Sequence, residues 1–287
     1  MRWEGRRQST NVEDVRGGGG GGRRGLGIGC GGMVLVIIFA LVTGRNPLQL
    51  LQTIEETQGG GPVRNVPSGD GTAPPEDEEG KFVRTVLANT EDVWTALLAN
   101  SDTPYQVPRL VRFSDSIASQ CGMASSAVGP FYCPADRKVY LDTSFFDELA
   151  QRFGAPGEFA AAYVVAHEVG HHVQNLLGID QQVREAQQRA WNEAQSNELS
   201  VKMELQADCF AGVWAHHADR DHQMIEPGDF ESGFKAAQVI GDDEIQKRTQ
   251  GYVVPESFTH GTAKQRTEWL RRGLQSGDPN DCDTFSR

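Results

Sequence analysis

Basic residues are scarce in most of this chain. Of its 287 residues, 27 are Lys or Arg and 39 are Asp or Glu, and the formal net charge is −12 at pH 7. Residues 1–44 contain six arginines and three acids, so the rest of the chain has 21 basic residues against 36 acidic ones. This balance argues against a basic nucleic-acid surface on the main domain, and the sequence contains no base-reading or stacking motif. We therefore expect no nucleic-acid partner.

Charged residues are absent from the 19-residue run Leu26–Gly44. This length is just sufficient to cross the hydrocarbon core of a bilayer. Six arginines precede the run and only Arg45 follows closely, so the positive-inside rule places the amino end in the cytoplasm. A cleaved signal peptide is the alternative, but no small-x-small site follows Val42 and the preceding region is long. We predict a single-pass signal anchor in the cytoplasmic membrane, with the bulk of the chain on the extracytoplasmic side.

Glycine, proline and acidic residues indicate where the folded part begins. Residues 1–25 are rich in Arg and Gly and are predicted to form a cytoplasmic tail. Residues 45–80 are rich in Gly, Pro and acids, a composition typical of an extended linker. Apolar residues recur at helical spacing from Lys81 onward. The predicted segments are thus a tail, a transmembrane helix at 26–44, a linker and one domain at 81–287.

The sequence has no C-x-x-C pair, which argues against cysteine ligands for a metal. Cys30 lies in the apolar run, which leaves Cys121, Cys133, Cys209 and Cys282. Four cysteines allow three pairings, and their even number agrees with an oxidising compartment. We predict Cys121–Cys133, which closes a short loop, and Cys209–Cys282, which ties the carboxyl end to a predicted helix that contains Cys209.

Histidines number only seven, yet two of them, His167 and His171, stand four residues apart with Glu168 directly after the first. Pro156 and Gly157 mark the start of a helix, and Gly178 marks its end, with no breaker among the largely apolar residues between them. Residues four apart share one helix face, so both rings can bind one tetrahedral zinc ion, with the glutamate as general base. The alternative is a buried helix whose histidines are satisfied by hydrogen bonds. Gly170 predicts a close approach of the metal or of another backbone.

A third ligand is predicted on a second helix, over residues 196–214, capped by Ser196 or Asn197. Glu204 and Asp208 lie one turn apart on one face of this helix, in a largely uncharged neighbourhood. With Glu204 as ligand and Asp208 accepting the other N–H of a ligand histidine, both carboxylates are satisfied. A solvated acidic pair is the alternative.

Three motifs resemble one known family. They are His167–Gln174, Met203–Trp214 and Ser257–Thr262, and the similarity extends from the opening Met1–Arg7 to Cys282. In these motifs the chain resembles the neutral zinc metallopeptidases of the bacterial envelope. The resemblance implies an α+β, mainly helical, zincin-like domain with a small sheet. It also implies a gluzincin-type site with one zinc ion on His167, His171 and Glu204, Glu168 as base, and Asp208 behind a ligand histidine.

The region before the zinc helix contains a predicted hairpin over residues 131–142, with a turn at Pro134–Arg137. By the same resemblance, the strand Val139–Leu141 could align an extended substrate through main-chain hydrogen bonds. An ordinary edge strand is the alternative. Further along, Thr262 and Gln265 form a capping box for a helix that we expect to reach Leu270.

A zinc peptidase also needs a donor for the oxyanion of its tetrahedral intermediate. His260, just before the capping box, is the first candidate, followed by Arg266 and Tyr252. The alternative for His260 is a local hydrogen-bonding residue. The other four histidines are interpreted as turn or surface residues: His172, His216, His217 and His222.

Together these features predict a membrane-anchored zinc metallopeptidase that hydrolyses peptide bonds of protein or peptide substrates, with Glu168 activating a zinc-bound water. A zinc-stabilised envelope scaffold that binds partner proteins without turnover is the alternative. Glu168 discriminates between the two, because a structural zinc site has no use for a carboxylate beside its first histidine.

Overall fold

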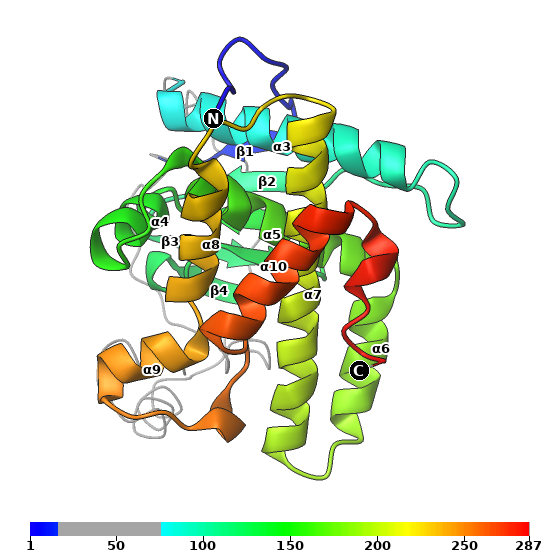
Figure 1. Ribbon diagram of the computed structural model, residues 1–287, viewed down its shortest axis with the longest axis vertical. Helices are drawn as coiled ribbons and strands as arrows, with labels where there is room; N and C mark the ends of the chain where they lie inside the picture. Colours follow the sequence, from blue (N-terminus) through cyan, green and yellow to red (C-terminus); the bar gives the residue numbers. More distant parts are fainter. Residues whose placement is uncertain (17–75, 287) are drawn as a thin grey trace, which may run out of the picture.

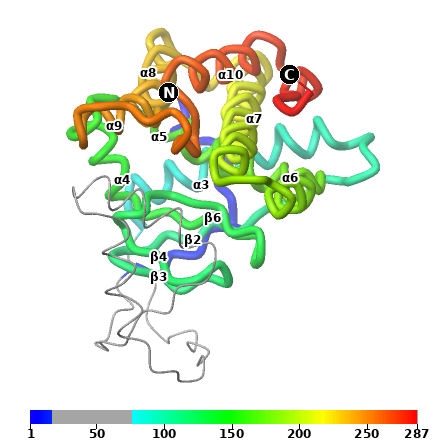
Figure 2. The backbone as a smooth tube through the Cα atoms, turned by 90° about the horizontal axis from the view of Figure 1, so that it is seen from below, coloured from blue at the N-terminus to red at the C-terminus, as the bar shows by residue number. Residues whose placement is uncertain are grey.

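The computed structural model describes residues 1–16 and 76–286. These residues form a mainly helical α+β fold with one four-stranded and one two-stranded sheet, which confirms the mainly helical α+β part of the prediction. Figure 2 shows the strands on one side of the molecule and helices α7, α8 and α10 on the other. In these two ranges no helix is both long and apolar enough to span a membrane. The predicted span at 26–44 lies outside them.

The larger sheet has the strand order β1-β2-β6-β5. Its strands are β1 (Val12–Asp14), β2 (Arg109–Arg112), β6 (Lys138–Leu141) and β5 (Phe131–Cys133). The first three strands are parallel, and β5 pairs antiparallel with β6, which confirms the predicted hairpin. Among the described strands β6 is paired on both sides, so Val139–Leu141 is neither the predicted substrate-aligning edge nor the alternative, an ordinary edge strand; the edge strands are β1 and β5. The smaller sheet is a second hairpin, β3 (Ser116–Ser119) and β4 (Gly122–Ser125).

Most of the remaining chain is helical (Figure 1). The helices are α3 (Glu78–Leu97), α4 (Ser144–Asp147), a π-helical turn (Glu148–Arg152), α5 (Glu158–Leu176), α6 (Ile179–Gln188), α7 (Glu193–Arg220), α8 (Asp229–Val239), α9 (Asp242–Gln250) and α10 (Ala263–Ser276). Short 3-10 turns lie at Ser126–Val128, Pro255–Ser257 and Pro279–Cys282.

Helix α5 is the buried centre of the fold. It begins after Gly157 and ends before Gly178, both at positive φ, so the predicted start and stop are confirmed. Nearly all of its residues are buried, as their apolar character predicts. Helix α7 is longer than expected, because the side chain of Asn192 accepts a hydrogen bond from the Gln195 N–H and caps the helix one turn before the predicted Ser196.

Glycines allow α7 to approach two other helices closely. A Cβ atom on Gly170 would lie 3.0 Å from the Ala207 carbonyl oxygen of α7, so the close backbone approach predicted at this glycine is confirmed. At the crossing of α7 and α10, a Cβ on Gly273 would lie 1.9 Å from the Cys209 carbonyl oxygen. Figure 1 shows α10 crossing α7. The capping box of α10 is also confirmed, although the helix runs past Leu270 to Ser276.

Residues 1–16 pack on the domain, which differs from the predicted separate tail at 1–25. Strand β1 extends the sheet, and Trp3 and Val12 are buried in the core. The ring of Trp3 packs edge-on against Phe82 of α3, with centroids 5.6 Å apart. The predicted linker also ends earlier than residue 80, because Asp77 caps α3 and the helix begins at Glu78. The described domain therefore comprises 1–16 together with 76–286.

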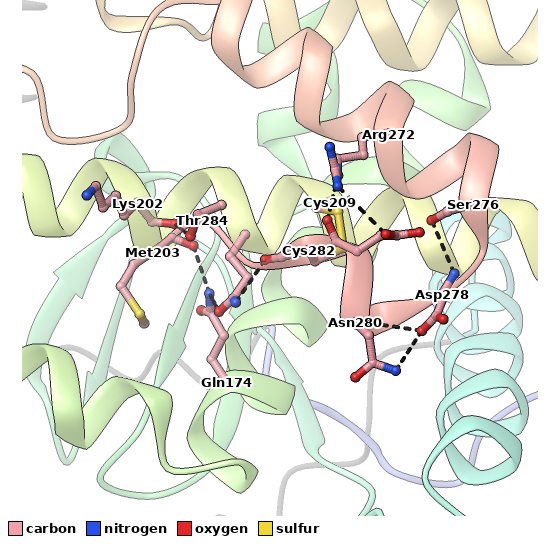
Figure 3. The surroundings of a disulfide bond; sticks show 12 residues. Gln174, Lys202, Met203, Cys209, Arg272, Ser276, Asp278, Asn280, Cys282 and Thr284 are labelled. Carbon is pink, nitrogen blue, oxygen red and sulfur yellow. Dashed lines mark hydrogen bonds and ion pairs between the residues drawn. A yellow bond between two sulfur atoms is a disulfide. The ribbon is translucent and has the colours of Figure 1, made fainter. Parts of the chain in front are cut away.

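Both predicted disulfides are present. Cys121, at the turn between β3 and β4, joins Cys133 at the end of β5. Cys209 of α7 joins Cys282 near the carboxyl end. Figure 3 shows how the second bond holds the carboxyl-terminal segment against α7.

Candidate metal centre

Three potential metal ligands meet where α5 and α7 cross. The Nε2 atom of His167 lies 3.1 Å from Glu204 Oε2, and Nε2 of His171 lies 3.4 Å from Glu204 Oε1. One ligand atom from each residue lies within 4.8 Å of the other two. Among the described residues this is the one such group of three or more His, Cys, Asp or Glu side chains.

These distances fit a small tetrahedral ion. Zinc binds His nitrogen and carboxylate oxygen at about 2.0–2.1 Å, which places the ligand atoms about 3.3 Å from one another. The two measured separations to Glu204 are close to this value. Two imidazoles and one carboxylate are also the donor set of catalytic zinc sites, which keep their fourth position for water or substrate. The chemistry and spacing of the three side chains therefore fit zinc.

The ring of His167 is oriented by a buried polar cluster behind it. Its Nδ1 lies 2.9 Å from Asp208 Oδ1, as predicted from the sequence. Asp208, which is completely buried, also accepts hydrogen bonds from the Tyr163 hydroxyl at 2.5 Å and from Arg266 Nε at 2.8 Å. With Nδ1 donating to the carboxylate, His167 turns Nε2, the nitrogen available to a metal ion, to the centre.

The ring of His171 is oriented by a neutral amide. Its Nδ1 donates to Gln174 Oε1 at 2.8 Å, so Nε2 faces Glu204. Gln174 did not emerge from the sequence reasoning. Its position three residues after His171, on the same face of α5, was the available signal. Tyr163 was also missed, although it lies one turn before His167 on the same helix.

Glu168 lies beside the centre and is not one of the three grouped ligands. Its side chain is buried, which raises the pKa of its carboxyl group, while His171 and His167 act in the opposite direction. The backbone N–H of Tyr132, on the edge strand β5, also interacts with this carboxylate. A buried carboxylate with a raised pKa can both accept and return a proton near neutral pH.

His260 is close enough to the centre for its charge to interact with that of Glu204. Its Nδ1 lies 3.2 Å from Asp242 Oδ1. The other oxygen of Asp242 accepts backbone N–H groups from Thr259, His260 and Gly261, at 2.7–3.0 Å. Asp242 thus holds both the backbone of residues 259–261 and the ring of His260. It stands 18 residues from His260, and no local sequence pattern connects the two.

The other sequence candidates have different surroundings. Arg266 is 3% exposed, and its guanidinium binds Asp208, so it supports the polar cluster behind His167. Tyr252 is 62% exposed. The interpretation of His172 as a turn or surface residue is wrong, because its ring is buried between the Tyr132 hydroxyl and the Gln106 carbonyl. Burial lowers the pKa of His172 to about 4.

Opposite charges hold the metal-free centre together. Burial lowers the pKa of His167, but Asp208 and Glu204 outweigh it and raise the value to about 10. The pKa of His171 is also raised, since Glu204 outweighs burial. Burial raises the pKa of Glu204, yet His171, His260 and His167 keep it well below its usual range. The carboxylates therefore favour protonation of both rings, and a metal ion that bound there would have to displace those protons.

Comparison with known proteins agrees with this geometry. Residues 1–285 match the family described as "Putative neutral zinc metallopeptidase". The uncharacterized protein YpfJ of Escherichia coli K12 is 48% identical over 292 residues, which cover 100% of this chain and 99% of that protein. The uncharacterized protein Rv2575 of Mycobacterium tuberculosis H37Rv is 48% identical over 208 residues, covering 69% of this chain and 68% of the other. No solved structure matches. The chain belongs to the putative neutral zinc metallopeptidase family.

Proposed function

We propose that this protein is a zinc-dependent peptidase with a zincin-like arrangement of its site. The observation that carries the proposal is the buried carboxylate of Glu168 beside the cluster of His167, His171 and Glu204. A structural zinc site would gain nothing from such a group, and it would normally have a fourth protein ligand. The family match supports the same chemistry.

His167, His171 and Glu204 would hold the ion. Zinc bound there would polarise the substrate carbonyl and make a nucleophile available from water near neutral pH. Glu168 takes the proton of that water, since burial raises the pKa of its carboxyl group above its usual value and makes the carboxylate a stronger base. The same carboxyl group then delivers the proton to the departing amine.

His260 supplies a donor for negative charge that develops on the carbonyl oxygen. Burial lowers its pKa, but Glu204 and Asp242 outweigh burial and raise it above its usual value, which favours the protonated ring. Asp242 binds Nδ1, so Nε2–H is the donor of this ring that remains for the reacting group. A preorganised donor of this kind is worth about 10²–10³ in kcat.

The free edge of β5 is the proposed site for an extended peptide. Strand β5 is one of the two edge strands of the described sheet, and the backbone of its central residue, Tyr132, contacts Glu168. A peptide that added to this edge would gain main-chain hydrogen bonds and pass beside the general base. This arrangement favours peptides over small amides as substrates.

We also propose that the domain lies on the extracytoplasmic side of the cytoplasmic membrane. The two disulfides support this location, since such bonds persist in oxidising compartments. The uncharged run 26–44, outside the described residues, is the proposed membrane-binding segment.

The decisive experiment replaces Glu168 in the full chain. Glu168→Gln keeps the volume and a hydrogen-bonding group, so we expect one zinc per chain and an unchanged unfolding temperature. Peptide cleavage should fall by at least about 10²–10⁴. Elemental analysis, calorimetry and an assay on unfolded protein substrates measure the three quantities. Wild-type cleavage by the zinc-loaded variant would overturn the mechanism. A zinc-loaded native protein that cleaves nothing, yet loses a bound partner on His167→Ala, would favour the scaffold.

A further inference from the structure

The second ligand histidine is connected to the carboxyl-terminal disulfide through two buried glutamines. Gln174 accepts from His171 Nδ1, and its own Nε2 donates to the Met203 carbonyl at 2.8 Å and to Gln206 Oε1 at 3.0 Å. Gln206 Nε2 in turn donates to the Cys282 carbonyl at 3.0 Å. Both glutamines are at most 5% exposed. Figure 3 shows Gln174 pointing to the segment that contains Cys282.

Gln174 and Gln206 form a hydrogen-bonded relay, and the backbone carbonyls of Met203 and Cys282 at its ends determine how each glutamine amide is oriented. Backbone carbonyls can only accept, so Gln206 must turn its NH₂ group to Cys282 and its oxygen to Gln174. Gln174 must likewise turn its NH₂ group to Met203, which leaves its oxygen facing His171. The relay therefore keeps a proton on Nδ1 of His171 and leaves Nε2, which faces Glu204, as the nitrogen available to a metal ion.

We propose that Gln174 and Gln206 are positioning residues for the metal centre, and that the Cys209–Cys282 disulfide holds the far end of their relay. This inference rests on the proposed zinc site. Cys209 follows Gln206 by three residues on α7, so the disulfide anchors Cys282 beside the amide that its carbonyl binds. The two ligand histidines thus differ, since a charged cluster orients His167 and a neutral relay orients His171.

The test uses Gln174→Met and Gln206→Met in the full chain, which keep the length of the side chain but remove the hydrogen bonds. Gln181→Met, on the exposed face of α6, is the matched control. Zinc affinity is measured by competition with a chromophoric chelator, and ¹⁵N NMR reports the ring tautomers. We expect Gln174→Met to weaken zinc binding about 10–100-fold and Gln206→Met about tenfold, within the range for groups that orient ligands. The Nδ1–H signal of His171 should be lost while that of His167 persists.

The disulfides provide a second, independent pair of variants. Removing the Cys209–Cys282 bond with alanines should weaken zinc binding at least about threefold, whereas removing Cys121–Cys133 should not change it. Affinities within twofold of wild type in both glutamine variants, with the His171 tautomer unchanged, would overturn the relay but leave the proposed function intact. Normal zinc binding without peptide cleavage in the wild type would instead overturn only the proposed function. A wild-type chain that binds no zinc would overturn both.

A different observation concerns the amino-terminal sixteen residues. The first described range ends at Arg16 and the second begins at Glu76, and the side chains of Arg16 and Asp77 are ion-paired at 2.6 Å. Arg112 of β2 is only 2% exposed and binds Asp14 at 2.9 Å and Asp77 at 3.0 Å. The two ends of the intervening segment are thus held at one place by a partly buried cluster of charges.

Further contacts hold residues 1–16 against α3. The Ser9 hydroxyl donates to Glu91 Oε1 at 2.6 Å, and Asn11 Nδ2 donates to the same oxygen at 2.8 Å. Strand β1 pairs in register with β2, Val12 lying beside Leu110. Removing these residues from the domain would expose buried apolar side chains and leave Glu91 without its partners.

A segment that crosses a bilayer once places the two regions that flank it on opposite sides of the membrane. Between 45 and 75 the sequence has no uncharged run longer than nine residues, which is too short for a second crossing. We infer that residues 1–16 and the metal-binding domain occupy the same compartment, so that the apolar run 26–44 does not separate them. The inference differs from the cytoplasmic amino end that the arginine distribution predicts.

Thiol labelling in intact spheroplasts tests the inference on the full chain with Cys30→Ser as the parent. Single cysteines are introduced by Gln8→Cys, exposed in the amino-terminal segment, or by Trp191→Cys, which replaces a side chain that is 94% exposed. Before lysis, a membrane-impermeant maleimide should label both of these single-cysteine variants or neither of them. Labelling of one alone would overturn the inference. As a second measurement, Arg7→Cys with Asp92→Cys should be joined by a short bis-maleimide in native membranes, since the original side chains lie 2.8 Å apart.

Discussion

Replacing Arg266 tests the buried cluster that supports His167. Asp208 is completely buried and receives four hydrogen bonds, from the Tyr163 hydroxyl, His167 Nδ1, and the Nε and Nη2 atoms of Arg266. Burial raises the pKa of Asp208, but Arg266 and His167 outweigh it and lower the value to about 2. Arg266→Met removes two of the four donors and the permanent positive charge, while keeping an apolar stem of similar length.

The expected loss depends on the charges that remain around the carboxylate. Breaking a buried ion pair by removing one partner costs about 3–5 kcal/mol, because the other charge stays buried. In the metal-free protein the protonated ring of His167 partly compensates, so we expect about 3 kcal/mol there. With zinc bound, His167 is neutral and Asp208 keeps no cation in contact, so the loss should approach about 5 kcal/mol. Arg266→Met should therefore also weaken zinc binding.

Urea unfolding followed by fluorescence, with and without zinc, measures both losses. Arg271→Met is the control on the same helix, because Arg271 is exposed and contacts Phe234 at 4.8 Å, an interaction worth about 1 kcal/mol or less. The double variant Arg266→Met with Asp208→Asn should recover part of the loss, since no buried charge is left unpaired. A loss below about 1 kcal/mol for Arg266→Met, or equal losses with and without zinc, would refute this reasoning.

Three further outcomes are expected. The pKa of His167 is about 10 in the folded metal-free protein and near 6.5 when unfolded, so its stabilising effect is complete below pH 6.5 and is lost as the pH rises through 10; calorimetry of the metal-free protein should show an unfolding temperature that falls over this window, and a flat profile would contradict the assignment. Gly273→Ala should destabilise the protein by more than about 3 kcal/mol, because its Cβ would lie 1.9 Å from the Cys209 carbonyl oxygen, and urea unfolding would disprove this with a loss under about 1 kcal/mol. Asp242→Asn should lower kcat about tenfold with little change in KM by weakening the orientation of His260, whereas an unchanged kcat at equal folded fraction would show that this orientation is unimportant.

Local patterns were sufficient for the first half of the site. Two histidines four residues apart on an uninterrupted apolar helix must lie on one face, and the glycines at 157 and 178 bound that helix. The same kind of information predicted the hairpin at 131–142 and the capping box of α10. The cap of α7 was misplaced because Ser196, Asn197 and Asn192 are all good caps, and only the longer packed helix selects the last of them.

These local patterns could not predict contacts between segments that are far apart in the sequence. Strand β6 is not an edge strand because β2 pairs with it. No periodicity in the sequence indicates where β2 lies in the sheet. Residues 1–16 have the composition of a tail, yet β1 pairs with β2 and Arg7 is ion-paired with Glu91 of α3. His172 has a polar neighbourhood in sequence, but in the fold it is covered by Tyr105 and Tyr132.

The sequence by itself determined which side chains share a helix face: His167 with His171, and Glu204 with Asp208. It also determined that four cysteines outside the apolar run could pair. Only the tertiary structure decided that these two faces meet, because the approach of α7 to α5 depends on the absence of a side chain at Gly170. The physical reason is that helical periodicity acts over a few residues, whereas the distance from His167 to Glu204 is set by the packing of two helices joined through a third.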